Sequence, residues 1–297
     1  MLTDNYCVQL QDRGVLAVSG EDKITFLQGL VSNDVNLISN TRSIYAALLT
    51  PQGKFFCDFF MSKHKYGFLL ECDLNILNDL KKKLQMHKLR SKIDLEDISE
   101  KFDVVAGFGD SIHSSVGLAG DPGKTIQVSN GIIMVDPRLG AMGLRMLLMK
   151  NSPPTFGQLK ECDSNDYELL RIRSGVPDGV QDMQFQKTIL LEAGFDELNG
   201  INWNKGCYMG QELTARTKYR GLIKRRLIPV SVDGTLPGPG TLIMFGEKEA
   251  GEIRSGVGNA AMALMRLNVL EEWSRLGGEL TAGSSSVVPQ KQNWMNF

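Results

Sequence analysis

A cysteine flanked by glycines and charged residues is the feature of this sequence most suited to chemistry. Residues 204–216 read N-K-G-C-Y-M-G-Q-E-L-T-A-R, and Cys207 lies between Gly206 and Gly210. The glycines predict a tight loop, and the residues that follow predict a helix beginning directly behind it. A helix N-terminus carries partial positive charge and Lys205 adds a full one, so we expect the Cys207 thiolate to form more readily than usual.

The alternative for Cys207 is a small buried hydrophobe, which is the ordinary role of a free cysteine. The polar neighbours oppose this interpretation, and the glycines offer little packing area. Glu212 and Arg216 stand four residues apart with the acid first, an arrangement that stabilises the first turns of a helix. The sequence therefore predicts a reactive or ligand-binding thiol presented from a rigid base.

The other cysteines and the histidines do not complete a recognisable site. The cysteines, no two of which lie within three residues of each other, are Cys7, Cys57, Cys72, Cys162 and Cys207. This spacing fits neither a disulfide framework nor a zinc knuckle. The histidines are His64, His87 and His113. None is near Cys207 in sequence, so a Cys–His hydrolase is not indicated, although spatial proximity stays open.

The composition is that of an ordinary soluble protein, and the length suits two or three domains. Of the 297 residues, 42% are hydrophobic and 23% are charged, with a net charge of -1. This balance does not favour nucleic acid or an acidic membrane as a partner. The N-terminus lacks a charged start followed by an apolar run, and no stretch approaches a membrane span. We expect a protein of a reducing compartment, the cytoplasm.

One basic cluster stands out against this balance. Its members are Lys218, Arg220, Lys224, Arg225 and Arg226. We interpret it as a solvated face in preference to an anion-binding patch.

Periodicity predicts the elements that must position Cys207. Strands are expected at 6–10, 15–19, 44–49, 54–61, 66–71, 92–98, 104–108, 125–128, 132–135 and 143–149. Helices are expected over 24–31, after an Asp73 cap, near 110–116 and from Asp163 or Ser164 onward. The run that ends at residue 135 predicts one compact α+β module of the type β-β-α-β-β-α-β.

The character of the chain changes after the Cys207 helix. Short strands separated by Gly- and Pro-rich turns are predicted at 227–232, 241–245, 252–255 and 261–266. Their regular spacing predicts a small β-barrel of about 70 residues. The tail over residues 281–292 is weakly specified.

At K-G-C-Y-M-G-Q-E-L-T-A-R the sequence resembles the YgfZ family of folate-binding-like proteins, which share the fold of the glycine-cleavage aminomethyltransferase (GcvT). Residues 20–35 and 51–54 look like N-terminal signatures of that family. G-V-P-D-G-V at 175–180 and K-R-R-L at 224–227 look closest to its mitochondrial and α-proteobacterial branch, an iron–sulfur cluster assembly factor. The resemblance covers nearly the whole chain.

The resemblance implies an α+β fold with a GcvT-like architecture of three parts. These parts are an N-terminal domain formed by residues 1–50 plus 136–225, a ferredoxin-like module at 51–135 and a C-terminal β-barrel at 226–297. It implies a function in maturation or repair of iron–sulfur clusters for a subset of 4Fe–4S enzymes. The expected partners are an A-type iron–sulfur scaffold protein and client iron–sulfur enzymes, without nucleic acid or membrane.

The resemblance also assigns roles to residues. Cys207 is implied as the essential thiol and as a transient ligand of a cluster shared with a partner. Carried over with it are the motif partners Lys205, Gly206, Tyr208, Gly210, Gln211, Glu212 and Arg216. A reduced folate, tetrahydrofolate, is expected in a central cavity, where Asp58 and Arg173 join the candidate cofactor-binding residues. The basic cluster could then hold a folate glutamate tail or face water.

Two departures weaken a second function, that of a folate-dependent aminomethyl or methyl transferase. Aminomethyltransferases carry an acidic pair after the turn that matches Gly53, and here Cys57 replaces the first acid while Asp58 keeps the second. Arg173 stands where those relatives have a glutamate, and arginine can only donate hydrogen bonds to a pterin ring. We therefore expect an assembly factor more than a classical transferase. A third alternative is a folate-binding or structural module in which Cys207 is a core residue.

The implied location is the cytoplasm of a bacterium, or the mitochondrial matrix of a eukaryote after loss of a targeting segment. The sequence leaves open the client enzymes, the oligomeric state and the source organism.

Overall fold

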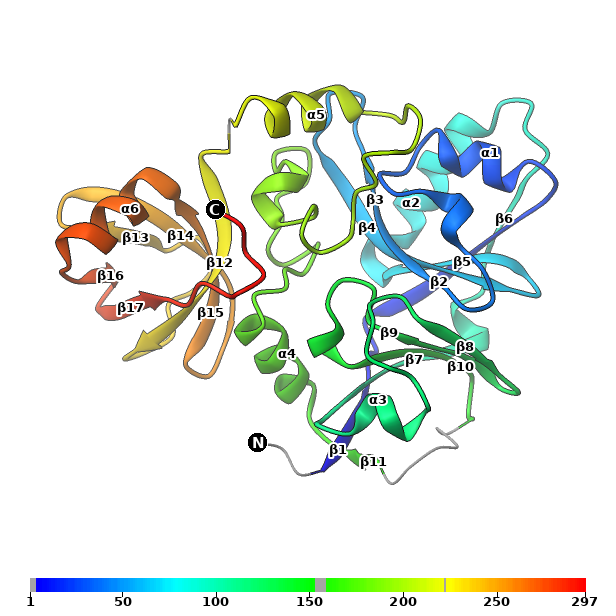
Figure 1. The fold of residues 1–297 in the computed structure, drawn as a ribbon, viewed down its shortest axis with the longest axis horizontal. Helices are drawn as coiled ribbons and strands as arrows, with labels where there is room; N and C mark the ends of the chain where they lie inside the picture. Colours follow the sequence, from blue (N-terminus) through cyan, green and yellow to red (C-terminus); the bar gives the residue numbers. More distant parts are fainter. Residues whose placement is uncertain (1–3, 153–158, 222) are drawn as a thin grey trace. The chain divides into compact units, whose positions relative to one another are not determined.

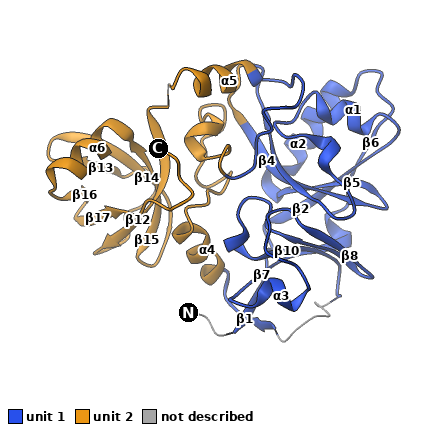
Figure 2. Cartoon of the chain, viewed as in Figure 1, with its two compact units in different colours: residues 1–51, 56–164, 198–211 blue, residues 52–55, 165–197, 212–297 orange. Residues whose placement is uncertain are grey.

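The computed structural model describes residues 4–152, 159–221 and 223–297 (Figure 1). The chain divides into two compact units (Figure 2). Unit 1 comprises residues 1–51, 56–164 and 198–211, and unit 2 comprises residues 52–55, 165–197 and 212–297.

Unit 1 contains a five-stranded sheet. Its strands, in spatial order, are β3 (Ile44–Leu49), β4 (Phe55–His64), β5 (Gly67–Asp73), β2 (Arg13–Ser19) and β6 (Asp94–Asp97). α1 (Lys23–Gln28) and α2 (Leu74–Lys88) pack apolar residues against this sheet. The Asp73 carboxylate accepts a hydrogen bond from the backbone N–H of Asn75, which confirms the predicted cap of α2.

A six-stranded sheet forms the second layer of unit 1. Its strands, in spatial order, are β11 (Leu159–Glu161), β1 (Asn5–Gln9), β7 (Phe102–Phe108), β10 (Leu144–Met149), β9 (Gly131–Val135) and β8 (Thr125–Val128). One apolar cluster joins Leu69 of β5 to Val104 of β7 and Ile132 of β9, so the two sheets bury a common layer. The six-stranded sheet also packs against Ile112 of α3 (Ile112–Ser115).

The strands expected to form one module at residues 51–135 are divided between the two sheets. β4, β5 and β6 belong to the five-stranded sheet, whereas β7, β8 and β9 belong to the six-stranded sheet. The reason is long-range pairing, because β2 inserts between β5 and β6 while β1 and β10 flank β7. The three domain boundaries inferred from the sequence stay a prediction.

Unit 2 contains the closed β-barrel that the turn spacing predicts. Its strands are β12 (Arg225–Asp233), β15 (Ala260–Arg266), β14 (Lys248–Val257), β13 (Leu242–Phe245), β16 (Leu280–Ala282) and β17 (Ser285–Pro289). Alternate residues of β12, namely Ile228, Val230 and Val232, point into the barrel core. α6 (Leu267–Leu276), which the sequence reasoning missed, packs Val269 against that core.

The rest of unit 2 is joined by buried ion pairs. Arg171 of α4 (Ser164–Arg173) donates to Asp182 at 2.7 Å and to the Ser255 hydroxyl of β14 at 2.9 Å.

Short 3-10 turns in the described part of the chain are η1 (Val35–Leu37), η2 (Ser99–Lys101) and η3 (Gly140–Met142) in unit 1, and η4 (Leu190–Ala193) in unit 2.

The basic cluster is solvated only in part: Arg220, Lys224 and Arg225 are exposed, as expected, whereas Lys218 is half-buried and Arg226 is buried. Its ion pairs are Lys218 with Asp196 at 2.7 Å, Arg225 with Glu192 at 3.0 Å and Arg226 with Glu197 at 2.8 Å. Arg226 is buried and also donates to the backbone carbonyl of Leu191. These ion pairs therefore connect residues 192–197 to Lys218 and to the first two residues of β12.

Candidate functional site

Cys207 lies on a loop of unit 1, residues 204–210, which we call the thiol loop. α5 (Gln211–Tyr219) begins directly behind it, as the sequence predicts. Gly210 ends the loop with a φ of 80°, a left-handed conformation that glycine adopts without steric cost. Cys207 is exposed, whereas Cys162 is half-buried and the other three cysteines are buried. This exposure excludes a core role for the Cys207 side chain.

Both ends of the thiol loop are tied to the segment that follows α1. The backbone N–H of Asn202 donates to the carbonyl of Ser32 at 3.1 Å, just before the loop. The N–H of Met209 donates to the carbonyl of Gly29 at 3.0 Å, near its end. The loop that presents the thiol is therefore held by backbone hydrogen bonds to residues 170 and 180 positions earlier in the chain.

Lys205 anchors the middle of the loop. Its ammonium nitrogen donates to the carbonyl oxygens of Val31 at 2.6 Å and Asn33 at 2.7 Å. Burial lowers the pKa of Lys205 from 10.5 to about 8, and attraction to the Asp34 carboxylate offsets part of that effect. The structure commits the Lys205 amino group to two buried carbonyls, so Lys205 positions the loop. The expected effect of its charge on the Cys207 thiolate stays a prediction.

Tyr208 and Gln211 join the loop to α5. The backbone N–H of Tyr208 donates to the Gln211 side-chain oxygen at 3.4 Å, and the N–H of Gln211 donates to the Tyr208 carbonyl at 3.2 Å. The Tyr208 ring is buried and lies 5.1 Å from the Lys205 nitrogen, within range of a cation–π interaction. Tyr208 thus contacts both Lys205 and Gln211.

Glu212 and Arg216 lie on α5 in unit 2 and are both exposed. They were expected to form an ion pair that rigidifies the helix start. Within the part of the chain that the structure describes, no ion pair joins them. Exposed pairs of this kind gain little because water solvates both charges and the side chains lose freedom. The rigidity of the loop comes from Lys205 and from the backbone bonds to residues 29–33.

Ser32 and Asn33 are positioning residues that the sequence reasoning treated only as a helix break and a family signature. Both are buried polar side chains. The Ser32 hydroxyl donates to the carbonyl of Gly200 at 2.6 Å, and the Asn33 amide donates to the carbonyls of Tyr45 and Asn199, each at 2.8 Å. The signal was present in the sequence as two adjacent polar residues after an apolar helix stripe.

The two residues expected to hold the pterin ring of a folate lie in different units. Asp58 is buried on β4 of unit 1, and its carboxylate accepts a hydrogen bond from the Tyr45 hydroxyl at 2.8 Å. Arg173 is exposed on α4 of unit 2 and donates to the Asn259 side chain at 3.2 Å. The Asp58 carboxylate can accept further hydrogen bonds beside the one from Tyr45, whereas Arg173 can only donate. Binding of a folate by these two residues stays a prediction.

Metal chemistry at this site rests on one thiol. Among the residues that the structure describes, no group of three or more His, Cys, Asp or Glu side chains could hold a metal ion. Thiolate is a soft ligand that suits iron in iron–sulfur clusters, which ordinarily take several such ligands. What the thiol loop can offer is a single, accessible sulfur at a fixed position.

Comparison with solved structures defines the fold. The chain superposes on the glycine cleavage system aminomethyltransferase T from Bartonella henselae with a TM-score of 0.76, covering 98% of this chain and 86% of that one at 15% sequence identity. A family model described as the C-terminal beta-barrel domain of CAF17 matches residues 224–297. The expected α+β, GcvT-like fold with a C-terminal barrel is confirmed.

Sequence comparison defines the family. The mitochondrial iron–sulfur cluster assembly factor IBA57 of Mus musculus is 32% identical over 287 residues, covering 89% of this chain and 78% of the mouse protein. The Homo sapiens protein of the same description is 33% identical over 278 residues, covering 87% and 77%. The chain belongs to the IBA57 family of iron–sulfur cluster assembly factors.

Both relatives are described as mitochondrial, which agrees with the second of the two expected locations and lends no support to the cytoplasmic one. In the described part of the chain, no helix is both long enough and apolar enough to cross a membrane.

Proposed function

We propose that this protein supports the assembly or repair of iron–sulfur clusters by offering Cys207 as a transient cluster ligand. The observation that carries the proposal is the exposed thiol on a loop fixed by Lys205, in a chain of the IBA57 family. Fixing the loop lowers the entropy lost when the sulfur binds a cluster held by another protein.

The cluster itself is cargo. One thiolate cannot hold it, so a partner protein, a second copy of the chain or a small thiol must supply the other ligands. We propose an A-type iron–sulfur scaffold as the donor and a subset of 4Fe–4S enzymes as clients. We also propose that the chain belongs to the wider YgfZ family and that the protein is located in mitochondria.

Aminomethyl transfer is the less favoured function. The Cys57 thiol, which stands in place of an acid, is buried, and burial raises the pKa of that thiol well above its usual range. It cannot serve as an acid or base near neutral pH, and Asp58 is engaged by Tyr45. Tetrahydrofolate binding stays a prediction that the cluster function does not require.

The test is anaerobic mixing of the purified full chain with a cluster-loaded A-type scaffold, followed by absorption and Mössbauer spectroscopy. Wild type is compared with Cys207→Ser and with Cys162→Ser, a matched control at the half-buried thiol. We expect a new cluster species with wild type and Cys162→Ser and none with Cys207→Ser. Identical spectra for all three proteins would falsify direct ligation by Cys207.

The same mixing in the presence of tetrahydrofolate separates the remaining alternatives. No change in the spectra is expected if folate has no part in cluster binding. A folate-dependent change in the spectra would show that the bound folate takes part in cluster binding. Measurable turnover of tetrahydrofolate with an aminomethyl donor would instead establish the transferase function.

A further inference from the structure

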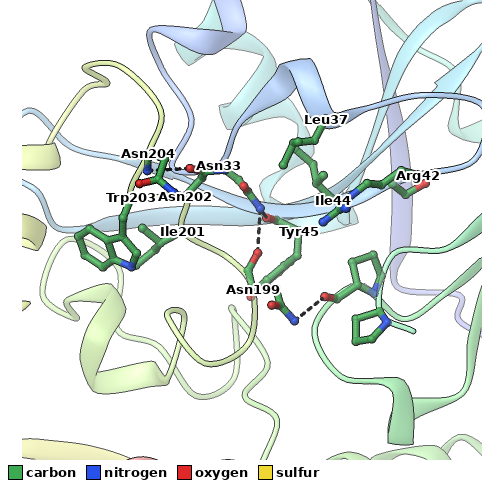
Figure 3. Close-up of a pocket in the computed structure, with 13 residues that line it drawn as sticks. Asn33, Leu37, Arg42, Ile44, Tyr45, Asn199, Ile201, Asn202, Trp203 and Asn204 are labelled. Carbon is green, nitrogen blue, oxygen red and sulfur yellow. Dashed lines mark hydrogen bonds between the residues drawn. The ribbon is translucent and has the colours of Figure 1, made fainter. Parts of the chain in front are cut away.

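A pocket of about 370 Å³ lies in unit 1 beside the thiol loop (Figure 3). Most of its lining comes from residues 42–45, Asn199 and residues 201–204, and the rest from Asn33, Leu37, Pro122 and Pro137. Figure 3 shows Arg42 on one side of the pocket and Asn202, Trp203 and Asn204 on the opposite side. No acidic residue of the described chain lines it, and Arg42 is its single cation.

Several polar groups at this pocket are not used by the fold. Arg42 is exposed, and among the described residues no hydrogen bond or ion pair engages its guanidinium. Among the residues that the structure describes, none forms a hydrogen bond with the Asn204 side chain. Asn202 accepts from the backbone N–H of Asn204 at 2.8 Å, which uses its oxygen and leaves its amide nitrogen to donate. The spare groups are therefore mainly donors.

The floor of the pocket is rigid. Asn199 has a left-handed φ of 57°, and its amide donates to the carbonyls of Arg138 at 3.2 Å and Pro137 at 3.4 Å. Its own carbonyl accepts from the Asn33 amide. These hydrogen bonds fix the backbone of Asn199 and the segment that leads to Asn202 and Asn204 before a ligand arrives, which reduces the entropy lost on binding.

We propose that this pocket binds a small organic molecule that carries one carboxylate and a flat apolar part. A guanidinium pairs with a carboxylate through two parallel hydrogen bonds, and amide donors can satisfy the remaining lone pairs. A single cation balances one carboxylate, whereas a phosphate near neutral pH carries closer to two charges. Trp203 and Ile201 supply apolar lining for the flat part. The volume lies at the small end of ligand pockets. This binding site goes beyond the proposed function and does not depend on it.

Calorimetric titration of the full chain at constant ionic strength tests the proposal, with benzoate as probe. Benzamide serves as its neutral isostere, and inorganic phosphate as an anion of different shape. We expect saturable binding of one benzoate, with benzamide at least about 10-fold weaker because it lacks the charge that Arg42 pairs. Arg42→Gln should lower the benzoate affinity about 10-fold. Arg90→Gln, at an exposed arginine of unit 1 outside this pocket, should leave it unchanged.

Trp203 provides a second measurement within the same pocket. Benzoate should change the tryptophan emission of the wild type, and Trp203→Phe should abolish that change. Circular dichroism checks that each variant folds. If Arg42→Gln does not fold, Asn204→Ala, at an exposed side chain, is used in its place. Absence of saturable benzoate binding, equal affinities for benzoate and benzamide, or no effect of either variant overturns the proposal. Tighter binding of phosphate than of benzoate overturns the assignment to a carboxylate.

Discussion

The amino group of Lys205 and the carbonyl oxygen of Val31 are 2.6 Å apart, although 174 positions separate the two residues in sequence. A second bond to the Asn33 carbonyl, at 2.7 Å, makes Lys205 the anchor of the thiol loop. A neutral amine still has two N–H groups, which is enough for both carbonyls. The hydrogen bonds can therefore persist on either side of the pKa of about 8.

Replacing this anchor should loosen the loop and destabilise unit 1. Lys205→Met leaves two buried carbonyls without a donor, and each unsatisfied group costs about 1–3 kcal/mol. We expect a lower free energy of unfolding in urea and a weaker cluster signal with the scaffold. Lys92→Met is the control, because Lys92 forms an exposed ion pair with Glu21 that should contribute less than about 1 kcal/mol. Equal losses in the two variants would contradict the anchoring role.

The same residue predicts a pH dependence of stability. The pKa of Lys205 is about 8 in the folded chain and 10.5 when unperturbed, so between these values the unfolded state binds more protons than the folded state. The free energy of unfolding contributed by Lys205 should therefore rise between pH 8 and pH 10.5, by at most about 1.4 kcal/mol per pH unit. The difference between wild type and Lys205→Met, measured across this range, isolates that contribution. A difference independent of pH would show that the pKa is not lowered.

The five cysteines should differ sharply in their rates of alkylation. Cys207 is exposed, whereas Cys57 and Cys72 are buried and burial raises the pKa of both thiols. Iodoacetamide at neutral pH should modify Cys207 first in the native protein, and Cys57 and Cys72 only after unfolding. Peptide mass spectrometry over a time course gives the order directly. Early modification of Cys57 would mean that β4 opens or that the thiol is accessible.

The two glycines of the thiol loop should respond differently to alanine. A Cβ added at Gly206 meets nothing within 4 Å, so Gly206→Ala should change the free energy of unfolding by less than about 0.5 kcal/mol. Gly210 has a φ of 80°, where an L side chain costs about 1–2 kcal/mol. Thermal or urea unfolding of both variants measures the contrast. If Gly206→Ala is as stable as wild type but does not bind the cluster, we would infer that a partner protein contacts the backbone at Gly206.

Glu71 should control the acid stability of unit 1. Burial alone would raise the pKa of Glu71, but attraction to Arg13 and Arg145 outweighs it and lowers that pKa from 4.5 to about 2. The contribution is present above pH 4.5, declines below it and is lost as pH falls through about 2. The shift corresponds to about 3 kcal/mol at neutral pH.

Glu71→Gln tests this contribution. The variant should be less stable than wild type at pH 7, and the difference should shrink as pH falls from 4.5 toward 2. Glu96→Gln, at an exposed pair with Lys101, serves as the control and should show almost no difference at any pH. A Glu71→Gln protein as stable as wild type at pH 7 would contradict the ion-pair assignment.

The local elements of this chain and its candidate thiol could be read from the sequence. The periodicity located β3 at its observed bounds and placed most other predicted strands and α2 within a few residues of theirs, because alternation and apolar stripes are local properties. The turn residues predicted the barrel, and the flanking glycines marked the loop that carries Cys207. α6 and the two strands of the tail were missed, although the stripe of Val269, Leu270 and Trp273 was a usable signal for the helix.

The tertiary structure alone decided how these elements serve the thiol. Sheet membership depends on pairing between distant strands, so no local pattern could show that residues 51–135 are divided between two sheets. The charge of Lys205 suggested an activator of the thiolate, and only the folded chain showed that Val31 and Asn33 engage it. The sequence predicts a solvent-exposed Arg226, whereas in the folded chain Arg226 is buried and forms an ion pair with Glu197. In each case the partner is remote in sequence, and a hydrogen bond or ion pair acts only between atoms that folding brings within about 3 Å.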